Sequence, residues 1–60
     1  MTDAEIYGLW ATAYDTASTR QIIGMISPDE FDRLVYNMEE RLGVNTWSVE
    51  RWAAAAGEGA

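Results

Sequence analysis

Apolar residues recur at helical spacing through the first third of the chain. With about 100° of rotation per residue, an arc of roughly 160° contains seven apolar side chains, those of Ile6, Tyr7, Leu9, Trp10, Ala13, Tyr14 and Ala17. The other side is mostly polar and also contains Gly8 and Ala11. The pattern predicts a helix from about Asp3 to Ala17. Continuing this helix past Ser18 would turn Ile22 onto the polar side, so we expect the chain to break near Ser18.

A continuous apolar run follows this first helix. Residues 19–25 are predicted to form a short helix or turn, and the run Ile22-Ile23-Gly24-Met25-Ile26 is expected to fill the core. A buried strand is the competing interpretation of such a run. That interpretation would need a second strand for pairing, and the sequence offers none.

The next segment has both helix signals and a clear apolar stripe. Ser27-Pro28-Asp29-Glu30 matches a capping box with proline at the first helical position, and Gly43 suits a left-handed helix end. The pattern predicts a helix from Pro28 to Leu42, with Val44 folding back onto Met38. Its stripe, about 100° wide, consists of Phe31, Leu34, Val35, Met38 and Leu42.

Similar capping patterns occur elsewhere in the chain. Thr2 and Ser18 each precede Glu or Gln by three residues, and Asn45 can cap a final helix that is expected over roughly Thr46 to Ala55. The expected inner face of that helix is Val49, Trp52, Ala53 and Ala56. Residues 57–60 are expected to be a frayed tail.

Together these elements predict an all-α fold in a single domain over residues 1–60. We expect a compact bundle of three main helices plus one short connecting helix. Without Cys or His there is neither a disulfide nor an ordinary zinc site, so helix packing or a partner must stabilise the chain. The predicted core is Ile6, Leu9, Trp10, Ala13, Ile22, Ile26, Phe31, Leu34, Val35, Met38, Leu42, Val49 and Trp52.

Charge narrows the set of partners. Four basic and ten acidic residues give a net charge of −6, which repels phosphate backbones and anionic lipids and favours a basic protein partner. The alternative is that the charge only keeps a small domain soluble. No apolar run approaches the roughly 20 residues that span a bilayer, and no signal-peptide pattern opens the chain. We therefore expect a cytoplasmic protein with no membrane association, and the sequence leaves its oligomeric state open.

Side chains for catalysis are scarce. The chain lacks His, Cys and Lys, and Ser18, Ser27 and Ser48 are each explained by helix starts. The acidic residues do not form the alternating loop with a central glycine that calcium sites of the EF-hand type require. We expect no catalytic residues, no cofactor and no metal site, and hence no enzyme activity.

Two aromatic residues fall outside the predicted apolar stripes. Tyr36 lies about 140° from Phe31 around its helix, beside Glu40, and Trp47 lies about 160° from Val49, four residues before Arg51. Trp47 and Arg51 are spaced for a cation–π pair. Exposed Trp, Tyr and Arg often anchor protein interfaces, so the candidate partner-binding residues are Trp47, Arg51, Tyr36 and Glu40. The alternative for Trp47 is that it tucks under its own helix or covers residues 19–25.

Residues 38–52 combine a glycine at the centre with apolar residues on both sides of it. The glycine is Gly43, and the apolar residues are Met38, Leu42, Val44, Val49 and Trp52. The segment resembles the helix-turn-helix of bacterial and phage repressors, in which Gly43 matches the turn glycine and the apolar residues match the positions that lock the two helices. The resemblance implies a helix-turn-helix-like C-terminal half. It also implies that Asn45, Thr46, Trp47, Ser48 and Arg51 face DNA. Glu39 departs from the pattern, because that family has a small residue where the helices cross.

Two functions therefore remain open at the level of the sequence. The first is a non-catalytic small acidic regulator or inhibitor that binds a basic protein partner, with the size and composition of a small phage or mobile-element product. The alternative is a helix-turn-helix DNA-binding transcriptional regulator that reads DNA through Asn45, Thr46, Ser48 and Arg51.

Overall fold

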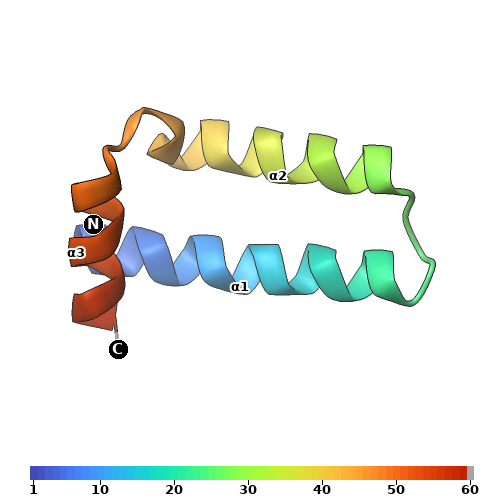
Figure 1. Ribbon diagram of the computed structural model, residues 1–60, viewed down its shortest axis with the longest axis horizontal. Helices are drawn as coiled ribbons and strands as arrows, with labels where there is room; N and C mark the ends of the chain where they lie inside the picture. Colours follow the sequence, from blue (N-terminus) through green and yellow to red (C-terminus); the bar gives the residue numbers. More distant parts are fainter. Residues whose placement is uncertain (60) are drawn as a thin grey trace.

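The computed structural model describes residues 1–59 and shows an all-α fold, as predicted (Figure 1). Two long helices, α1 (Asp3–Ile22) and α2 (Pro28–Leu42), run antiparallel and side by side. A short 3₁₀ helix, η1 (Val44–Thr46), then leads to α3 (Val49–Gly59), which crosses the N-terminal end of α1. In the described part of the chain α1 packs against both other α-helices, whereas α2 and α3 make no close backbone contact with each other.

Helix α1 begins at the predicted cap but ends later than predicted. The Thr2 hydroxyl accepts a hydrogen bond from the Glu5 amide at 3.1 Å, and the Glu5 carboxylate accepts one from the Thr2 amide at 3.0 Å. The expected break near Ser18 is wrong, because α1 continues without interruption to Ile22. Nothing between Ser18 and Ile22 removes a helical hydrogen bond, so local helix propagation wins over the burial of the isoleucines.

A Schellman motif ends α1. The Met25 amide donates to the Arg20 carbonyl at 2.8 Å, the Gly24 amide donates to the Gln21 carbonyl at 3.1 Å, and Gly24 has φ +79°. Of the short helix or turn predicted over residues 19–25, the structure has the turn, at residues 23–26, whereas residues 19–22 belong to α1 and no separate short helix forms there. The apolar run does not fill the core, because the turn leaves Ile22, Ile23 and Met25 exposed at 81%, 63% and 67%.

Helix α2 has the predicted bounds. The Ser27 hydroxyl accepts from the Glu30 amide and the Glu30 carboxylate accepts from the Ser27 amide, both at 3.1 Å. At the other end Gly43 takes φ +73°, the left-handed conformation that a glycine adopts without steric cost. Val44 follows Gly43 and is completely buried. On α2 itself, Leu34 was expected in the core but is about half exposed.

The start of α3 differs from the prediction. The Ser48 hydroxyl accepts a hydrogen bond from the Arg51 amide at 3.1 Å, so Ser48 and not Asn45 caps α3. The short helix of the fold, η1, lies before α3, whereas the predicted short helix lies before α2. Helix α3 also continues to Gly59, beyond the predicted end at residue 55, whereas residue 60 of the expected tail lies outside the described residues.

This later start changes which face of α3 packs inward. Val49, predicted to be in the core, is 81% exposed, and Ala53 is exposed as well. Trp52 remains on the inner face, and Ala55 becomes one of the two buried residues of the described chain, at 1% exposure. The expected inner face is therefore wrong at Val49 and Ala53 and right at Trp52 and Ala56, which is half-buried.

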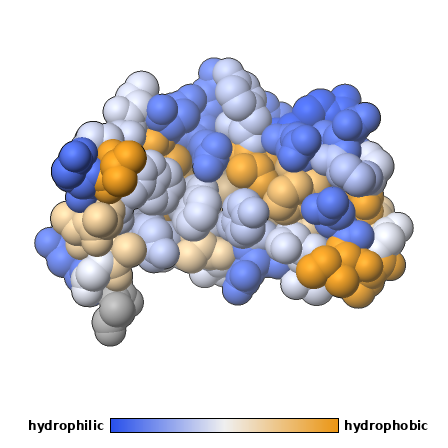
Figure 2. Space-filling view, in the orientation of Figure 1, coloured by the Kyte–Doolittle hydropathy of each residue, from blue (hydrophilic) through white to orange (hydrophobic). Residues whose placement is uncertain are grey.

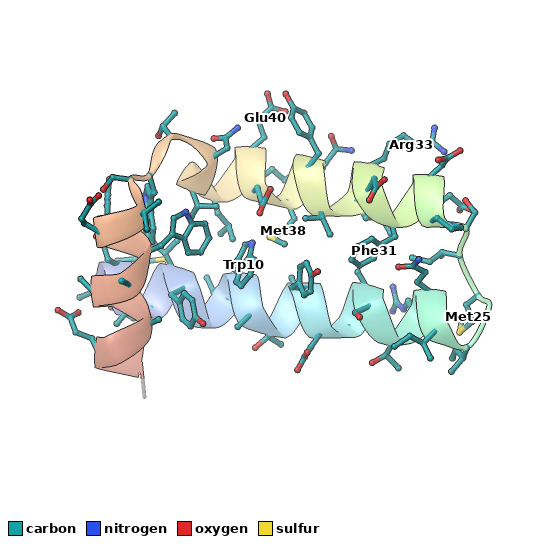
Figure 3. All side chains as sticks on the ribbon, viewed as in Figure 1. Trp10, Met25, Phe31, Arg33, Met38 and Glu40 are labelled. Atoms are coloured by element: carbon teal, nitrogen blue, oxygen red, sulfur yellow. The ribbon has the colours of Figure 1, made fainter. Side chains whose placement is uncertain are left out.

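A row of aromatic rings takes the place of an enclosed core. The rings of six of the seven aromatic residues lie 5.0–6.1 Å from a neighbouring ring, in a series that runs from α3 along α1 to α2. They are Tyr7, Trp10, Tyr14, Phe31, Trp47 and Trp52, and Figure 3 shows Trp10 and Phe31 between the two long helices.

The enclosure of this row is incomplete. Val44 and Ala55 are the only buried residues in the described chain, and Leu9, which we predicted to be buried, is about half exposed. The accessible surface of 4295 Å² exceeds the roughly 3,900 Å² expected for a folded monomer of 6.7 kDa. The fold therefore leaves apolar surface available for contacts with other molecules.

Candidate protein-binding surfaces

The predicted pair of Trp47 and Arg51 forms at the start of α3. The central carbon of the Arg51 guanidinium lies 4.4 Å from the centroid of the Trp47 ring, which confirms the cation–π contact. The guanidinium also binds Asp3 at the start of α1, with Nε 2.8 Å from Oδ2 and Nη2 3.0 Å from Oδ1. These hydrogen bonds from Arg51 lower the pKa of Asp3 below its ordinary value of 3.8 and raise that of Arg51.

Trp47 makes contacts inside the protein. Its ring meets Trp52 edge-on at 5.2 Å, and the residue is half-buried. The contact matches the alternative in which Trp47 tucks against its own helix, so only part of the indole is open to a partner. Arg51, which stacks on Trp47, joins the start of α3 to α1 through Asp3.

The other two candidate residues lie on a different surface. Tyr36 and Glu40 are exposed one turn apart on α2, and Figure 3 shows Glu40 on the side of α2 that faces away from α1. Among the described residues no hydrogen bond, ion pair or ring contact joins either of them to Trp47 or Arg51. The structure therefore brings together two of the four candidates and leaves Tyr36 and Glu40 apart.

Three of the four polar residues of the helix-turn-helix alternative lie ahead of α3, and the fourth, Arg51, lies on its first turn. Asn45 and Thr46 belong to η1, where Thr46 Oγ1 donates to the Gly43 carbonyl at 3.4 Å, and Ser48 caps α3. All three are exposed. Glu39, the residue that departs from the repressor pattern, accepts a hydrogen bond from the Trp10 indole.

The most exposed aliphatic cluster is one that the sequence analysis placed in the core. Ile22, Ile23 and Met25 surround the turn between α1 and α2, and we call them the apolar turn. Figure 2 shows hydrophobic side chains gathered at this end of the molecule, and Figure 3 shows Met25 at the outer edge of the turn. The local signal that could have revealed this exposure is Gly24, a helix-ending glycine placed directly after the two isoleucines.

Acidic side chains dominate the surroundings of the apolar turn. Residues 15–33 contain four carboxylates and two arginines, Arg20 and Arg33. Asp29 and Asp32, on the first turns of α2, are both exposed. The turn thus combines an apolar centre with a negative border.

Surface depressions and possible metal ligands are the remaining features of the described residues. No group of three or more possible metal ligands occurs among them. Two shallow depressions of about 310 and 300 Å³ are each lined by one helix alone, around Thr16 on α1 and around Arg33 on α2. No helix in this part of the chain combines the length and the apolar character needed to cross a membrane.

Comparison with known proteins adds no relative: no family model, curated protein or solved structure matches this chain.

Proposed function

We propose that this chain is a non-catalytic regulator or inhibitor that acts by binding a protein partner through its apolar turn. The observation that carries the proposal is the exposure of Ile22, Ile23 and Met25 together at one end of the molecule. Three large aliphatic side chains that remain in water within four residues are unfavourable for an isolated monomer, and such clusters mark interaction sites.

The border of the turn defines the chemistry of the partner. Exposed carboxylates at Asp29 and Asp32 follow the aliphatic side chains on the first turns of α2, and the chain as a whole has a charge of −6. The complementary surface is an apolar pocket with basic residues around it. Opposite charges steer such partners together and raise the association rate.

The surface predicted from the sequence plays a supporting part in this proposal. Tyr36 and Glu40 are exposed on α2 and can extend the acidic contact area, whereas Arg51 is already bonded to Asp3. Arg51 is also the only basic residue after Arg41, so the residues after Gly43, which would face DNA in the helix-turn-helix alternative, offer one cation to the phosphates. We therefore place protein binding ahead of DNA binding, and a cytoplasmic location stays a prediction.

The test compares two matched surface variants. Ile22→Ser with Ile23→Ser removes the apolar turn, and Val49→Ser removes an aliphatic side chain that is as exposed as Ile22, at 81%, but lies on α3. Each protein is immobilised and exposed to host lysate with and without nuclease, and captured proteins are then purified for titration calorimetry. We expect a basic protein on the wild type and on Val49→Ser, and its loss on the double variant.

Three outcomes would contradict the proposal. They are a captured protein that binds the double variant as tightly as the wild type, a partner that disappears after nuclease treatment, and a partner with an acidic surface. A helical circular dichroism spectrum for each variant shows whether a loss of binding reflects the surface and not unfolding.

A further inference from the structure

A second apolar surface lies on the side of the α1–α2 pair that faces away from α3. Tyr7 contacts Trp52 of α3, and Leu9 lies about 200° from Tyr7 around α1. On α2, Glu39 bonds Trp10 on the α3 side, and Leu34 lies about 140° from Glu39. Leu9 and Leu34 therefore share the opposite side, which we call the open face.

The open face is apolar at its centre. Leu9 and Leu34 are 48% and 45% exposed. Helical spacing of three or four residues places half-buried Ile6 and Ala13 beside Leu9, and Met38 beside Leu34. In the described chain α3 and η1 approach only the other side and one end of the pair, so neither covers these residues.

The charged residues of the open face are balanced, unlike those of the chain as a whole. Glu5 and Arg20 lie within about 40° of Leu9 around α1, and Glu30 and Arg41 lie within about 40° of Leu34 around α2. Because the helices are antiparallel, Glu5 and Arg41 are at one end of the face, and Arg20 and Glu30 are at the other. The face thus has no net charge, whereas the chain has −6.

We infer that the open face binds a second copy of the same chain, so that two helical pairs form a four-helix dimer. A two-fold rotation that reverses the helices end for end sets Glu5 opposite Arg20 of the other copy and Glu30 opposite Arg41. Every charged corner then meets its opposite, while Leu9 and Leu34 are withdrawn from water. Self-complementarity of this kind is what a two-fold interface requires.

The available area is adequate for such a dimer. The Cα atoms of the molecule extend over 33 × 22 × 19 Å, so the broad side offers on the order of 600 Å² per copy and about 1,200 Å² in total. Stable interfaces start near about 1,000 Å². Most of the acidic excess, including Asp3, Asp15 and Glu50, lies on other surfaces, so the dimer does not force these charges together.

Sedimentation equilibrium over about a hundredfold range of protein concentration tests the inference. The wild type is expected to show a monomer–dimer equilibrium, and Leu34→Glu is expected to raise the dimer Kd at least about tenfold. The matched control is Val49→Glu, which adds the same charge at an exposed site on α3 and is expected to leave the Kd unchanged.

A second variant tests the same interface without changing its apolar residues, in case Leu34→Glu unfolds the chain. Arg20→Glu with Arg41→Glu reverses two exposed charges, leaves the apolar residues in place and sets carboxylates against Glu5 and Glu30 of the other copy. It is expected to be monomeric with an unchanged helical spectrum. A wild type that stays monomeric throughout, or dimers that persist in both variants, would overturn the inference. Neither result affects the apolar turn, because the double serine variant tests a different surface.

Discussion

The indole of Trp10 donates a hydrogen bond to the carboxylate of Glu39, with 2.9 Å between Nε1 and Oε2. The bond joins α1 to α2 across 29 positions of the sequence, at the place where α3 also meets α1 through the contact of Trp10 with Trp52. It satisfies the polar atom of a tryptophan that is otherwise packed among aromatic rings.

Removing either partner of the Trp10–Glu39 hydrogen bond is expected to show how much the bond stabilises the fold. Trp10→Phe and Glu39→Ala each destabilise the fold, and a double-mutant cycle should give a coupling energy of about 1 kcal/mol, since the acceptor is charged but only partly buried. Urea unfolding of the two single variants and the double variant measures it. Glu40→Ala on the exposed side of α2 is the control, and a coupling energy indistinguishable from zero would refute the expectation.

The two glycines Gly43 and Gly8 are expected to respond oppositely to alanine. Gly43 has φ +73°, so Gly43→Ala forces a strained conformation and should cost about 1 kcal/mol. Gly8 lies inside α1, and beyond its chain neighbours and the backbone of its own helix no atom lies within 4 Å of an added Cβ, so Gly8→Ala should stabilise the chain by roughly 0.5–1 kcal/mol. Thermal or urea unfolding reports both signs, and a shift in the same direction for both variants would contradict the structure.

Acid is expected to weaken the fold through three carboxyl groups. Hydrogen bonds from Arg51 lower the pKa of Asp3 below 3.8, and backbone amides in the helix caps lower those of Glu5 and Glu30 below 4.5. Because the folded pKa values are the lower ones, the stabilisation is present above the unfolded values and is lost as pH falls through the folded values.

The melting temperature measured between about pH 6 and pH 2 checks this expectation. It should fall below about pH 4.5, and the fall should be smaller in Asp3→Asn and in Glu30→Gln, which have already lost one titrating group. Asp15→Asn is the control, because the Asp15 carboxylate makes no ion pair or hydrogen bond in the described structure. A melting temperature independent of pH in this range would count against the caps and the ion pair.

Replacement of Trp52 is expected to be far more damaging than replacement of Ile22. Trp52 contacts the rings of Tyr7, Trp10 and Trp47, so Trp52→Ala should cost about 2–4 kcal/mol, most of the stability of a domain this small. Ile22 is 81% exposed, and Ile22→Ala should change the stability by less than about 0.5 kcal/mol. Equal losses for both in urea unfolding would place Ile22 back in the core.

Local sequence signals were sufficient for α2 but not for the ends of its neighbours. Ser27, Pro28 and Gly43 mark both ends of α2 by contacts within a few residues, so its bounds could be predicted without knowing the fold. The end of α1 differs from the prediction because Ile22, which the apolar pattern places in the core, is exposed to solvent. The spacing of apolar residues shows which of them a helix can bury on one side. It does not show which of them remain exposed to water.

The start of α3 could not be predicted from local sequence signals either. Asn45 and Ser48 are both good caps, and three residues separate the two choices. Choosing Asn45 placed Val49 in the core, whereas the cap at Ser48 exposes Val49 and buries Ala55. Only tertiary packing against α1 distinguishes the two.

The candidate binding residues likewise include some contacts that could be predicted from the sequence and others that could not. The stacking of Trp47 and Arg51 depends on a spacing of four residues and was predictable, and the structure confirms it. The bond from Arg51 to Asp3 spans 48 positions and depends on α3 crossing the start of α1, so no local pattern could reveal it. The apolar turn was visible as a hydrophobic run, but its exposure follows from the Schellman turn at Gly24.

The spacing of the three indoles provides a built-in optical signal. Trp52 lies 5.0 Å from Trp10 and 5.2 Å from Trp47, measured between ring centroids, and both pairs meet at steep angles. Electronic transitions of rings this close and this inclined couple to each other, so the native chain should produce a split circular dichroism band that vanishes on unfolding. Because the three rings come from α1, the segment before α3 and α3 itself, the band reports the docking of α3 without any added dye.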